Sequence, residues 1–384
     1  MLEAPALLSL LHGKGIRLIS GTPCSYLKPL INAALGDPRF TFRDAVNEGD
    51  AVAMAAGARL AGAPGAAIFQ NSGLGNAVNT LTSLCHPFQV PVLLVVTRRG
   101  EPGGKPDEPQ HELMGRITPA LLDTMEIPWA RLPSEAAAAA AAVDHAFASM
   151  ERRSGPFALL VSDGTLAPHP LAARPDAGPI GERTFSFSEN LTRPFGRRAS
   201  RTEALALLRA GRAPSECLVA TTGYTGRELY ALGDEPWNLY MVGSMGSASA
   251  FGLGASLFLG GRPVTVIDGD GAALMRLGNL ATLGAYAPPS LTHVVLDNEA
   301  HDSTGGQPTV SRGVALAAIA QACGYGSVVS TDDPAELARA LAHPRPRGPL
   351  FIHFRTRTGA SKDLPRPSVA PAEVFRRLGR WLQG

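Results

Sequence analysis

The chain has 384 residues, of which 45% are hydrophobic and 18% are charged, and its formal net charge is +2. This length and composition are typical of a folded protein with two or three domains, and they exclude a disordered chain or a single small module. The basic residues are scattered along the chain, so the charge pattern does not predict a nucleic-acid-binding surface. We therefore expect a small-molecule ligand and no nucleic-acid partner.

The cysteines and the apolar segments favour a cytoplasmic protein. No two cysteines form a CxxC pair, which predicts neither a disulfide framework nor a zinc site. The four are Cys24, Cys85, Cys217 and Cys323. The N-terminal apolar run is preceded by Glu3 and by no basic residue, so we expect no secretory signal. The uncharged run at residues 236–261 is long enough to cross a bilayer, but its many glycines and serines argue against a membrane span.

Short apolar runs alternate with alanine-rich helical segments throughout the chain. In the first half the runs occupy residues 15–20, 66–70, 90–97 and 157–162. In the second half they occupy residues 217–221, 264–268, 293–297 and 350–354. Nearly continuous apolar strands separated by helices are typical of parallel sheets covered on both faces. We expect an α/β fold with two domains, each a mostly parallel sheet with helices on both faces.

A change of composition marks the domain boundary. From residue 167 to about residue 200 the sequence becomes rich in proline, arginine and serine and loses its periodicity, which is typical of a surface linker. We place the first domain at residues 1–175, the linker at 176–200 and the second domain at 201–384.

The most specific motif lies in the second half, where an apolar strand leads into Gly269-Asp270-Gly271 and the next strand leads into Asn298. A right-handed βαβ unit brings the carboxyl ends of neighbouring strands to one sheet edge, so we expect Asp270 and Asn298 side by side. Carboxylate and amide oxygens suit Mg²⁺, which completes its shell with phosphate oxygens and water. The amides that open the following helix can donate to a diphosphate. The alternative is an ordinary strand-turn-helix in which Asp270 only caps the helix.

This arrangement, in which the asparagine follows the aspartate by 28 positions, resembles the diphosphate and magnesium motif of thiamine diphosphate enzymes. The resemblance implies that Mg²⁺ is bound by the side chains of Asp270 and Asn298 and by the carbonyl of Ala300. Asp268 lies inside the preceding strand and is the less favoured ligand.

An enzyme of this family also needs a carboxyl group beside the aminopyrimidine ring of the cofactor, and Glu48 is the candidate. It precedes a helix rich in alanine and glycine in the segment NEGDAVAMAAG at residues 47–57. The resemblance implies that Glu48 shares a proton with the ring nitrogen, in a pocket dry enough to favour that sharing. The alternative reading is an acid stabilised by the dipole at a helix N-terminus.

The resemblance covers nearly the whole chain and is closest to the phosphonopyruvate decarboxylases. Its further segments are GTPCSYLKPLI at 21–31, QNSGLGNAVNTLTSL at 70–84, residues 99–128, TTGYTGRELY at 221–230 and DNEAHDSTGGQPT at 297–309. It implies a pyrimidine-binding domain followed by a diphosphate-binding domain. It also implies a homo-oligomer, a dimer or larger, with active sites between subunits.

The same resemblance implies the residues that bind the cofactor. Met245 would support its bent shape, Thr222 and Gly223 would meet the diphosphate, and Asn76 would lie near the pyrimidine. The full implied set is Glu48, Asn76, Thr222, Gly223, Ser244, Met245, Gly269, Asp270, Gly271, Ala272, Asn298, Ala300 and His301.

Catalytic and substrate contacts are implied in the first half. Ser25 stands where simpler 2-oxo acid decarboxylases carry an acid, and His111 lies in their histidine-bearing loop, so both are expected to be catalytic with Glu48. A phosphonate near charge −2 needs cations or N–H donors around it. The expected substrate contacts are Ser25, Lys28, Arg99, Gln110 and His111, and the cations favoured for the phosphonate are Lys28 and Arg99.

The implied reaction is the thiamine diphosphate- and Mg²⁺-dependent decarboxylation of phosphonopyruvate to phosphonoacetaldehyde and CO₂, in the biosynthesis of phosphonates. The sequence leaves open a sulfopyruvate decarboxylase, or another decarboxylase or carboligase with this cofactor. A non-catalytic cofactor-binding regulator is disfavoured because Glu48 is present. A dinucleotide oxidoreductase is disfavoured because the Gly-x-Gly pairs at 73–75 and 252–254 lack the third glycine of GxGxxG.

Overall fold

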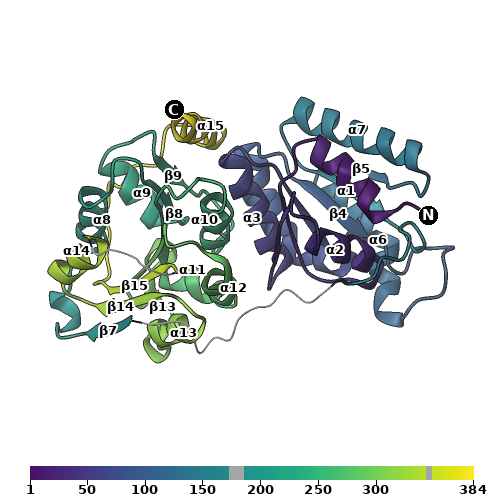
Figure 1. Ribbon diagram of the computed structural model, residues 1–384. Coiled ribbons are helices and arrows are strands. Elements are labelled where there is room, and N and C mark those ends of the chain that lie inside the picture. The colour runs from purple at the N-terminus through teal and green to yellow at the C-terminus, as the bar shows by residue number, and fades with distance from the viewer. Residues whose placement is uncertain (173–185, 343–347) are drawn as a thin grey trace. The chain divides into compact units, whose positions relative to one another are not determined.

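The computed structural model describes residues 1–172, 186–342 and 348–384. The chain divides into two compact units, Met1–Ala177 and Gly178–Gly384, each built on its own sheet (Figure 1). In the described part of the chain, no helix is both long and apolar enough to span a membrane.

The first unit contains a six-stranded sheet in the order β2-β1-β3-β4-β6-β5, in which every pairing is parallel. Its strands are β1 (Leu18–Gly21), β2 (Thr41–Asp44), β3 (Gly65–Phe69), β4 (Leu93–Thr97), β5 (Trp129–Arg131) and β6 (Phe157–Val161). Its helices are α1 (Ala4–Gly13), α2 (Lys28–Leu35), α3 (Glu48–Leu60), α4 (Leu74–Thr80), α5 (His86–Phe88), α6 (Glu112–Thr124) and α7 (Ala136–Arg153). The central strands β1, β3, β4 and β6 are buried at every position, which explains their continuous apolar sequences.

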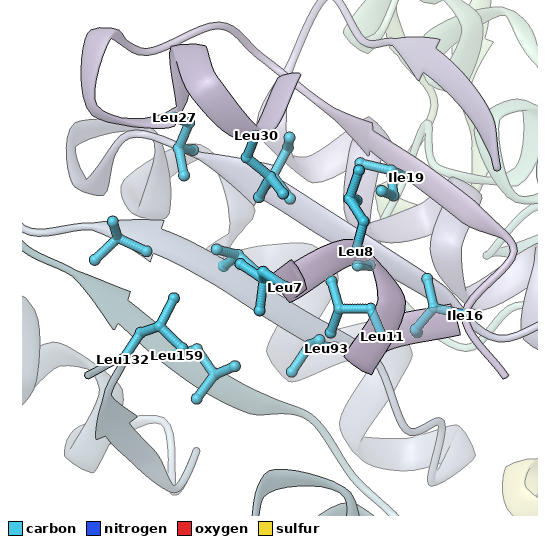
Figure 2. Packing of buried hydrophobic residues seen from close by; sticks show 14 of the residues in the cluster. Leu7, Leu8, Leu11, Ile16, Ile19, Leu27, Leu30, Leu93, Leu132 and Leu159 are labelled. Carbon is cyan, nitrogen blue, oxygen red and sulfur yellow. The ribbon is translucent and has the colours of Figure 1, made fainter. Parts of the chain in front are cut away.

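Helix α1 packs against α2 and α7 over one hydrophobic cluster. Figure 2 shows Leu7, Leu8 and Leu11 of α1 in the middle of this cluster, with Leu93 and Leu159 of the sheet. Each of these five side chains is almost completely buried, so the cluster removes a large apolar area from water.

Helix α3 packs closely against β1 and β3 because its side chains are small. A Cβ atom at Gly65 of β3 would lie 2.9 Å from the Cα atom of Ala55, so the helix and strand backbones are almost in contact. Asn47 caps the helix by accepting a hydrogen bond from the Gly49 amide at 2.9 Å. Glu48 is the first residue of this capped helix, so the packing of α3 against β1 and β3 also holds Glu48 in place.

The second unit contains a seven-stranded parallel sheet in the order β7-β14-β15-β11-β10-β8-β9. Its strands are β7 (Ser186–Asn190), β8 (Cys217–Ala220), β9 (Asn238–Tyr240), β10 (Val264–Gly269), β11 (Leu291–Asp297), β14 (Ser327–Thr331) and β15 (Leu350–Arg355). A short antiparallel pair joins β12 (Ala300–His301) to β13 (Gln307–Pro308). The helices are α8 (Arg201–Ala210), α9 (Tyr224–Ala231), α10 (Ala248–Ser256), α11 (Asp270–Met275), α12 (Asn279–Tyr286), α13 (Leu316–Ala322), α14 (Pro334–Ala342) and α15 (Pro371–Gln383).

The expected linker at 176–200 differs from the structure in its second part. Strand β7 lies inside this range and pairs in parallel with β14, and the Asp332 carboxylate accepts hydrogen bonds from the amides of Thr192 and Arg193. The chain therefore belongs to the second sheet from residue 186 onward. An exposed edge strand needs no apolar periodicity, which is why its sequence resembles a linker. Residues 173–185 lie outside the described residues.

Candidate functional site

The expected metal-binding residues meet at the carboxyl edge of the second sheet. Strands β10 and β11 are parallel neighbours, with Gly269 opposite Leu296, so Asp270 and Asn298 follow adjacent strand ends. Each is only 3% exposed, and both line one cavity. The structure therefore brings together the two residues that the sequence separates by a helix.

Most of the expected cofactor-binding residues of this unit line the same cavity. They are Thr222, Met245, Gly269, Asp270, Gly271, Ala272, Asn298, Ala300 and His301. Gly223 has a φ of +90°, and a Cβ atom there would lie 3.4 Å from the Oγ atom of Ser303, which also lines the cavity. Ser244 is buried with a φ of +51°, and its Oγ atom lies 2.7 Å from the Oγ atom of Ser247. Gly223 and Ser244 themselves are not among the residues that line the cavity.

The cavity fits an anionic group held through a divalent cation. Two buried polar atoms at its wall, Thr221 Oγ1 and Arg201 Nε, have no hydrogen-bond partner among the described residues. A Cβ atom at Gly271 would lie 2.5 Å from the His301 ring and 3.0 Å from Met245 Cε, so only glycine leaves this space open. Asp270, Asn298 and Ala300 all line this cavity, and a carboxylate, an amide oxygen and a backbone carbonyl are the kinds of oxygen donor that Mg²⁺ prefers.

Asp270 is a buried carboxyl group with hydroxyl partners in Thr309 and Ser311. Burial raises its pKa above the ordinary value, against the hydrogen bond from Thr309 Oγ1, which lowers it. A cation beside Asp270 would favour its charged form, as expected for a metal ligand. Thr309 was not expected to belong to the site.

Asp297, next to Asn298, is anchored from the sheet interior. Burial alone would raise its pKa, but the pKa is lowered because His353 Nε2 lies 2.8 Å from Oδ2 and Ser311 donates to Oδ1 at 2.8 Å. The end of strand β11 is thus fixed by an imidazole partner on one carboxylate oxygen and a hydroxyl partner on the other.

Asn298 is held by a second carboxylate. Its Nδ2 atom donates to Asp302 Oδ2 at 2.7 Å, and its Oδ1 atom accepts from the Ala300 amide at 3.2 Å. Asp302 in turn forms an ion pair with Arg201 at 3.3 Å. Arg201 and Asp302 both line the cavity, and neither was among the expected site residues.

Glu48 and Asn76 are brought together in the first unit. Glu48 Oε2 accepts from Asn76 Nδ2 at 2.8 Å, and Oε1 accepts from Thr22 Oγ1 at 3.0 Å. A Cβ atom at Gly73 would lie 2.3 Å from Glu48 Cγ, so this glycine makes room for the carboxylate. Both oxygens of Glu48 therefore have fixed donors.

His111 is buried at 6% exposure and lies beside Gln70, whose Nε2 atom is 3.5 Å from His111 Nδ1. Gln70 also donates to Ser72 Oγ at 2.7 Å and accepts from Cys24 Sγ at 3.5 Å. Gln70 thus connects His111 with Ser72, which directly precedes Gly73.

The guanidinium of Arg99 is already bound within the chain. Its Nε atom donates to Asp107 Oδ2 at 2.9 Å, Nη2 pairs with Oδ1, and Nη1 donates to Ser25 Oγ at 3.3 Å. The hydrogen bond from Arg99 holds the pKa of Asp107 well below its ordinary value. The ring of Tyr26 lies 5.2 Å from the guanidinium. Arg99 and Ser25 are therefore neighbours, but Arg99 has an internal counter-ion.

The other two expected substrate residues, Lys28 and Gln110, are exposed. Lys28 is the first residue of α2 and forms no ion pair with any residue that the structure describes.

Sequence reasoning missed several residues that hold the expected ones: Thr22, Gln70, Arg201, Asp302 and Thr309. Four of them, all except Arg201, lie in the segments that carry the resemblance, which makes them candidates but does not indicate their roles. Arg201 had no such signal, because it lies far from Asn298 in sequence and reaches the site only through the fold.

Two models of known protein families match the chain. Residues 3–117 match the thiamine pyrophosphate enzyme, N-terminal TPP binding domain, and residues 230–354 match the thiamine pyrophosphate enzyme, C-terminal TPP binding domain. Thiamine pyrophosphate is another name for thiamine diphosphate. Each model falls in one of the two units.

Similar curated proteins extend over nearly the whole chain. A phosphonopyruvate decarboxylase of Streptomyces viridochromogenes is 46% identical, over 98% of this chain and 94% of that protein. A phosphonopyruvate decarboxylase of Streptomyces hygroscopicus is 45% identical, over 98% and 93%. A sulfopyruvate decarboxylase of Methanosarcina acetivorans is 29% identical, over 95% and 93%.

Solved structures support the fold. The benzoylformate decarboxylase from Polynucleobacter necessarius matches with a TM-score of 0.69 and 14% identity, over 96% of this chain and 100% of that one. At this identity the match shows the fold alone, whereas the near-full-length sequence identity shows the family. The chain belongs to the phosphonopyruvate decarboxylase family of thiamine pyrophosphate enzymes.

Proposed function

We propose that this chain is a thiamine diphosphate- and Mg²⁺-dependent decarboxylase that converts phosphonopyruvate into phosphonoacetaldehyde and CO₂. The observation that carries the proposal is the cavity where Asp270 and Asn298 meet, in a chain 46% identical to a phosphonopyruvate decarboxylase. We assign residues 1–175 to the pyrimidine-binding domain and the unit that follows to the diphosphate-binding domain.

In the second unit, Asp270, Asn298 and the Ala300 carbonyl would hold Mg²⁺. Gly271, Thr221 and Thr222 would face the diphosphate, and Met245 would support the cofactor from the side. When bound, thiamine diphosphate would supply a nucleophilic carbon that adds to the substrate ketone and a thiazolium ring that takes up the electron pair left when CO₂ departs. The protein provides placement and a site from which water is excluded.

In the first unit, Glu48 would hold and release a proton at its carboxyl group. Thr22 and Asn76 fix the direction of both oxygens, so the proton is presented in one geometry. His111 would present Nε2 to the substrate, because its Nδ1 atom faces Gln70. Ser25 and Gln110 would line the same substrate site.

For the phosphonate we propose Lys28 as the main cation. Its charge is not matched by a counter-ion in the described part of the chain, whereas the charge of Arg99 is matched by Asp107. A buried or half-buried dianion needs at least one such charge-assisted contact. Arg99 would then act on the substrate through the loop that it holds and through Ser25.

The substrate assignment is tested by assaying phosphonopyruvate, sulfopyruvate and pyruvate side by side with the holoenzyme. We expect the highest kcat/KM for phosphonopyruvate. A preference for sulfopyruvate or pyruvate would overturn the substrate assignment and leave the decarboxylase class intact. Absence of CO₂ release from all three would overturn the function itself.

We also propose that the working enzyme is a homo-oligomer whose sites combine Glu48 of one copy with Asp270 of another. Exposed apolar side chains lie within three positions of site residues in the sequence of both units: Val46 and Leu113 in the first unit, and Val242, Met275 and Val310 in the second. Large exposed apolar side chains near polar site residues favour a surface that a partner covers.

Mixing two inactive variants tests this assembly. In a mixture of Glu48→Gln and Asp270→Ala chains that exchange subunits, mixed dimers contain one site with both native residues. Random exchange should then restore about a quarter of the parental activity. If each site were built from a single chain, every site would carry one defect, and the mixture would stay inactive.

A further inference from the structure

Asp302 joins three separate segments of the second unit at a single oxygen atom. Its Oδ2 atom accepts hydrogen bonds from Asn298 Nδ2 at 2.7 Å, from the Gly359 amide at 3.0 Å and from Arg201 Nη1 at 3.3 Å. The Asp302 side chain is 9% exposed. A carboxylate so enclosed is costly unless a cation compensates it, and that cation is Arg201.

Arg201 is itself buried and shared between two acids. Its side chain is 8% exposed, and Nη2 donates at 2.8 Å to Glu228, which is 2% exposed. Thr202 Oγ1 donates to the other oxygen of Glu228 at 2.9 Å, so the direction of Glu228 is fixed as well. The guanidinium therefore has little freedom, and it holds Asp302 in one position.

The direction of the Asn298 amide depends on this carboxylate. The two ends of an asparagine amide differ, because the oxygen can bind a metal ion and the NH₂ group cannot. Nδ2 donates to Asp302 while Oδ1 accepts from the Ala300 amide, so the two ends of the amide have different partners, and Asn298 lines the cavity together with Asp270. Without Asp302, the amide could rotate and present its NH₂ group to the cation.

We propose that Asp302, held by Arg201, is a positioning residue for the metal site: it fixes Asn298 with Oδ1 toward the bound Mg²⁺. The inference rests on the proposed function, since it assumes that the cavity binds Mg²⁺ with thiamine diphosphate. Outer partners that orient a ligand are typically worth about 10- to 100-fold in metal affinity.

The test is calorimetric titration of Mg²⁺ into the chain at a fixed concentration of thiamine diphosphate. Asp302→Ala should weaken Mg²⁺ binding by at least about tenfold. Asp302→Asn keeps an oxygen that can accept from Asn298 Nδ2, so it should recover part of the loss. Activity of Asp302→Ala should rise toward the parental kcat as Mg²⁺ is increased, because the defect is in occupancy.

Two further variants separate this role from a general loss of stability. Arg201→Lys keeps the charge but cannot bridge both acids, so it should also weaken Mg²⁺ binding, and it serves if Asp302→Ala does not fold. Asp234→Ala is the matched control: Asp234 pairs with Arg377 at 2.7 Å in the same unit and does not line the cavity. It should lower the melting temperature and leave Mg²⁺ affinity unchanged.

Parental Mg²⁺ affinity in the folded Asp302→Ala or Arg201→Lys chain would overturn the inference while the proposed function stands. An equal loss of Mg²⁺ affinity in Asp234→Ala would overturn the inference as well, because the loss would then reflect a less stable fold and not the orientation of Asn298. If the parent chain binds no thiamine diphosphate with Mg²⁺, the proposed function fails and this inference falls with it.

Discussion

Replacing Arg99 or Asp107 should impair all 2-oxo acid substrates alike, because the two side chains bind each other and the loop between them. Asp107 also accepts a hydrogen bond from the Gly100 amide at 3.2 Å. Gly100 has a φ of +69°, and a Cβ atom there would lie 2.1 Å from the carbonyl oxygen of His111. The pair therefore fixes the backbone against which His111 rests.

The size of the effect follows from the geometry of the pair. Two charge-assisted hydrogen bonds of about 1.5–3 kcal/mol each give an upper limit. The Arg99 side chain is 20% exposed and that of Asp107 is 7% exposed, so solvent weakens the interaction only in part. We expect a coupling energy of about 2 kcal/mol in a double-mutant cycle of Arg99→Ala and Asp107→Ala, measured by urea unfolding.

The pH dependence of this contribution has a definite sign. The folded pKa of Asp107 is lowered, so its stabilisation is present above the unfolded pKa of about 4 and is lost as the pH falls toward the folded value. The difference in unfolding free energy between the parent and Asp107→Ala should be constant from about pH 8 to pH 5 and shrink below about pH 4.

The assay that decides the role of Arg99 compares two substrates. If the ordered loop loses about 1–2 kcal/mol of stabilising free energy, kcat/KM should fall about 5- to 30-fold. This fall should be equal for phosphonopyruvate and pyruvate. A rise of KM confined to phosphonopyruvate would refute this reasoning, because it would mean that the guanidinium binds the phosphonate directly. Additive effects of the two substitutions would refute the pairing.

Three further predictions concern the two halves of the site. Asp270→Ala should abolish retention of thiamine diphosphate at a Mg²⁺ concentration that saturates the parent; calorimetry showing equal binding would contradict the metal assignment. Glu48→Gln should still bind the cofactor but lose about 10²- to 10⁴-fold in kcat, since an amide cannot share the proton, and near-parental turnover would rule out that role. Lys28→Ala should raise KM for phosphonopyruvate about tenfold, the loss of about 1.4 kcal/mol, with pyruvate unchanged; equal effects on both substrates would argue against a phosphonate contact.

The strands that could be predicted from the sequence are those buried on both faces. The eight apolar runs correspond to β1, β3, β4, β6, β8, β10, β11 and β15. Among the missed strands of the two large sheets, β2, β5 and β7 are exposed or half-buried edges, β9 is a buried edge of only three residues, and β14 lies next to the edge strand β7. An edge strand pairs with one neighbour and keeps one side open, so polar residues are tolerated and the apolar signal disappears.

The site could be predicted where its chemistry lies in contiguous motifs. Asp270, Asn298 and Glu48 follow strand ends or begin a helix, so their positions follow from the order of elements. The role of Asp302 could not be read from DNEAHD, because it depends on Arg201, which the fold brings from the start of α8. The ion pair between Arg99 and Asp107 could not be predicted either, because the sequence does not show whether a charged loop residue has a partner within the chain.

Helix α3 limits where this enzyme can be re-engineered. All its residues from Gly49 to Ala58 are buried, and the close contact of Gly65 with Ala55 leaves no room for a larger side chain on that face. Added methylene groups would push the helix away from the sheet and carry Glu48 with it. Its amides should be among the slowest to exchange with deuterium. Libraries aimed at new substrates should therefore vary the loops around Ser25 and His111 and leave α3 as it is.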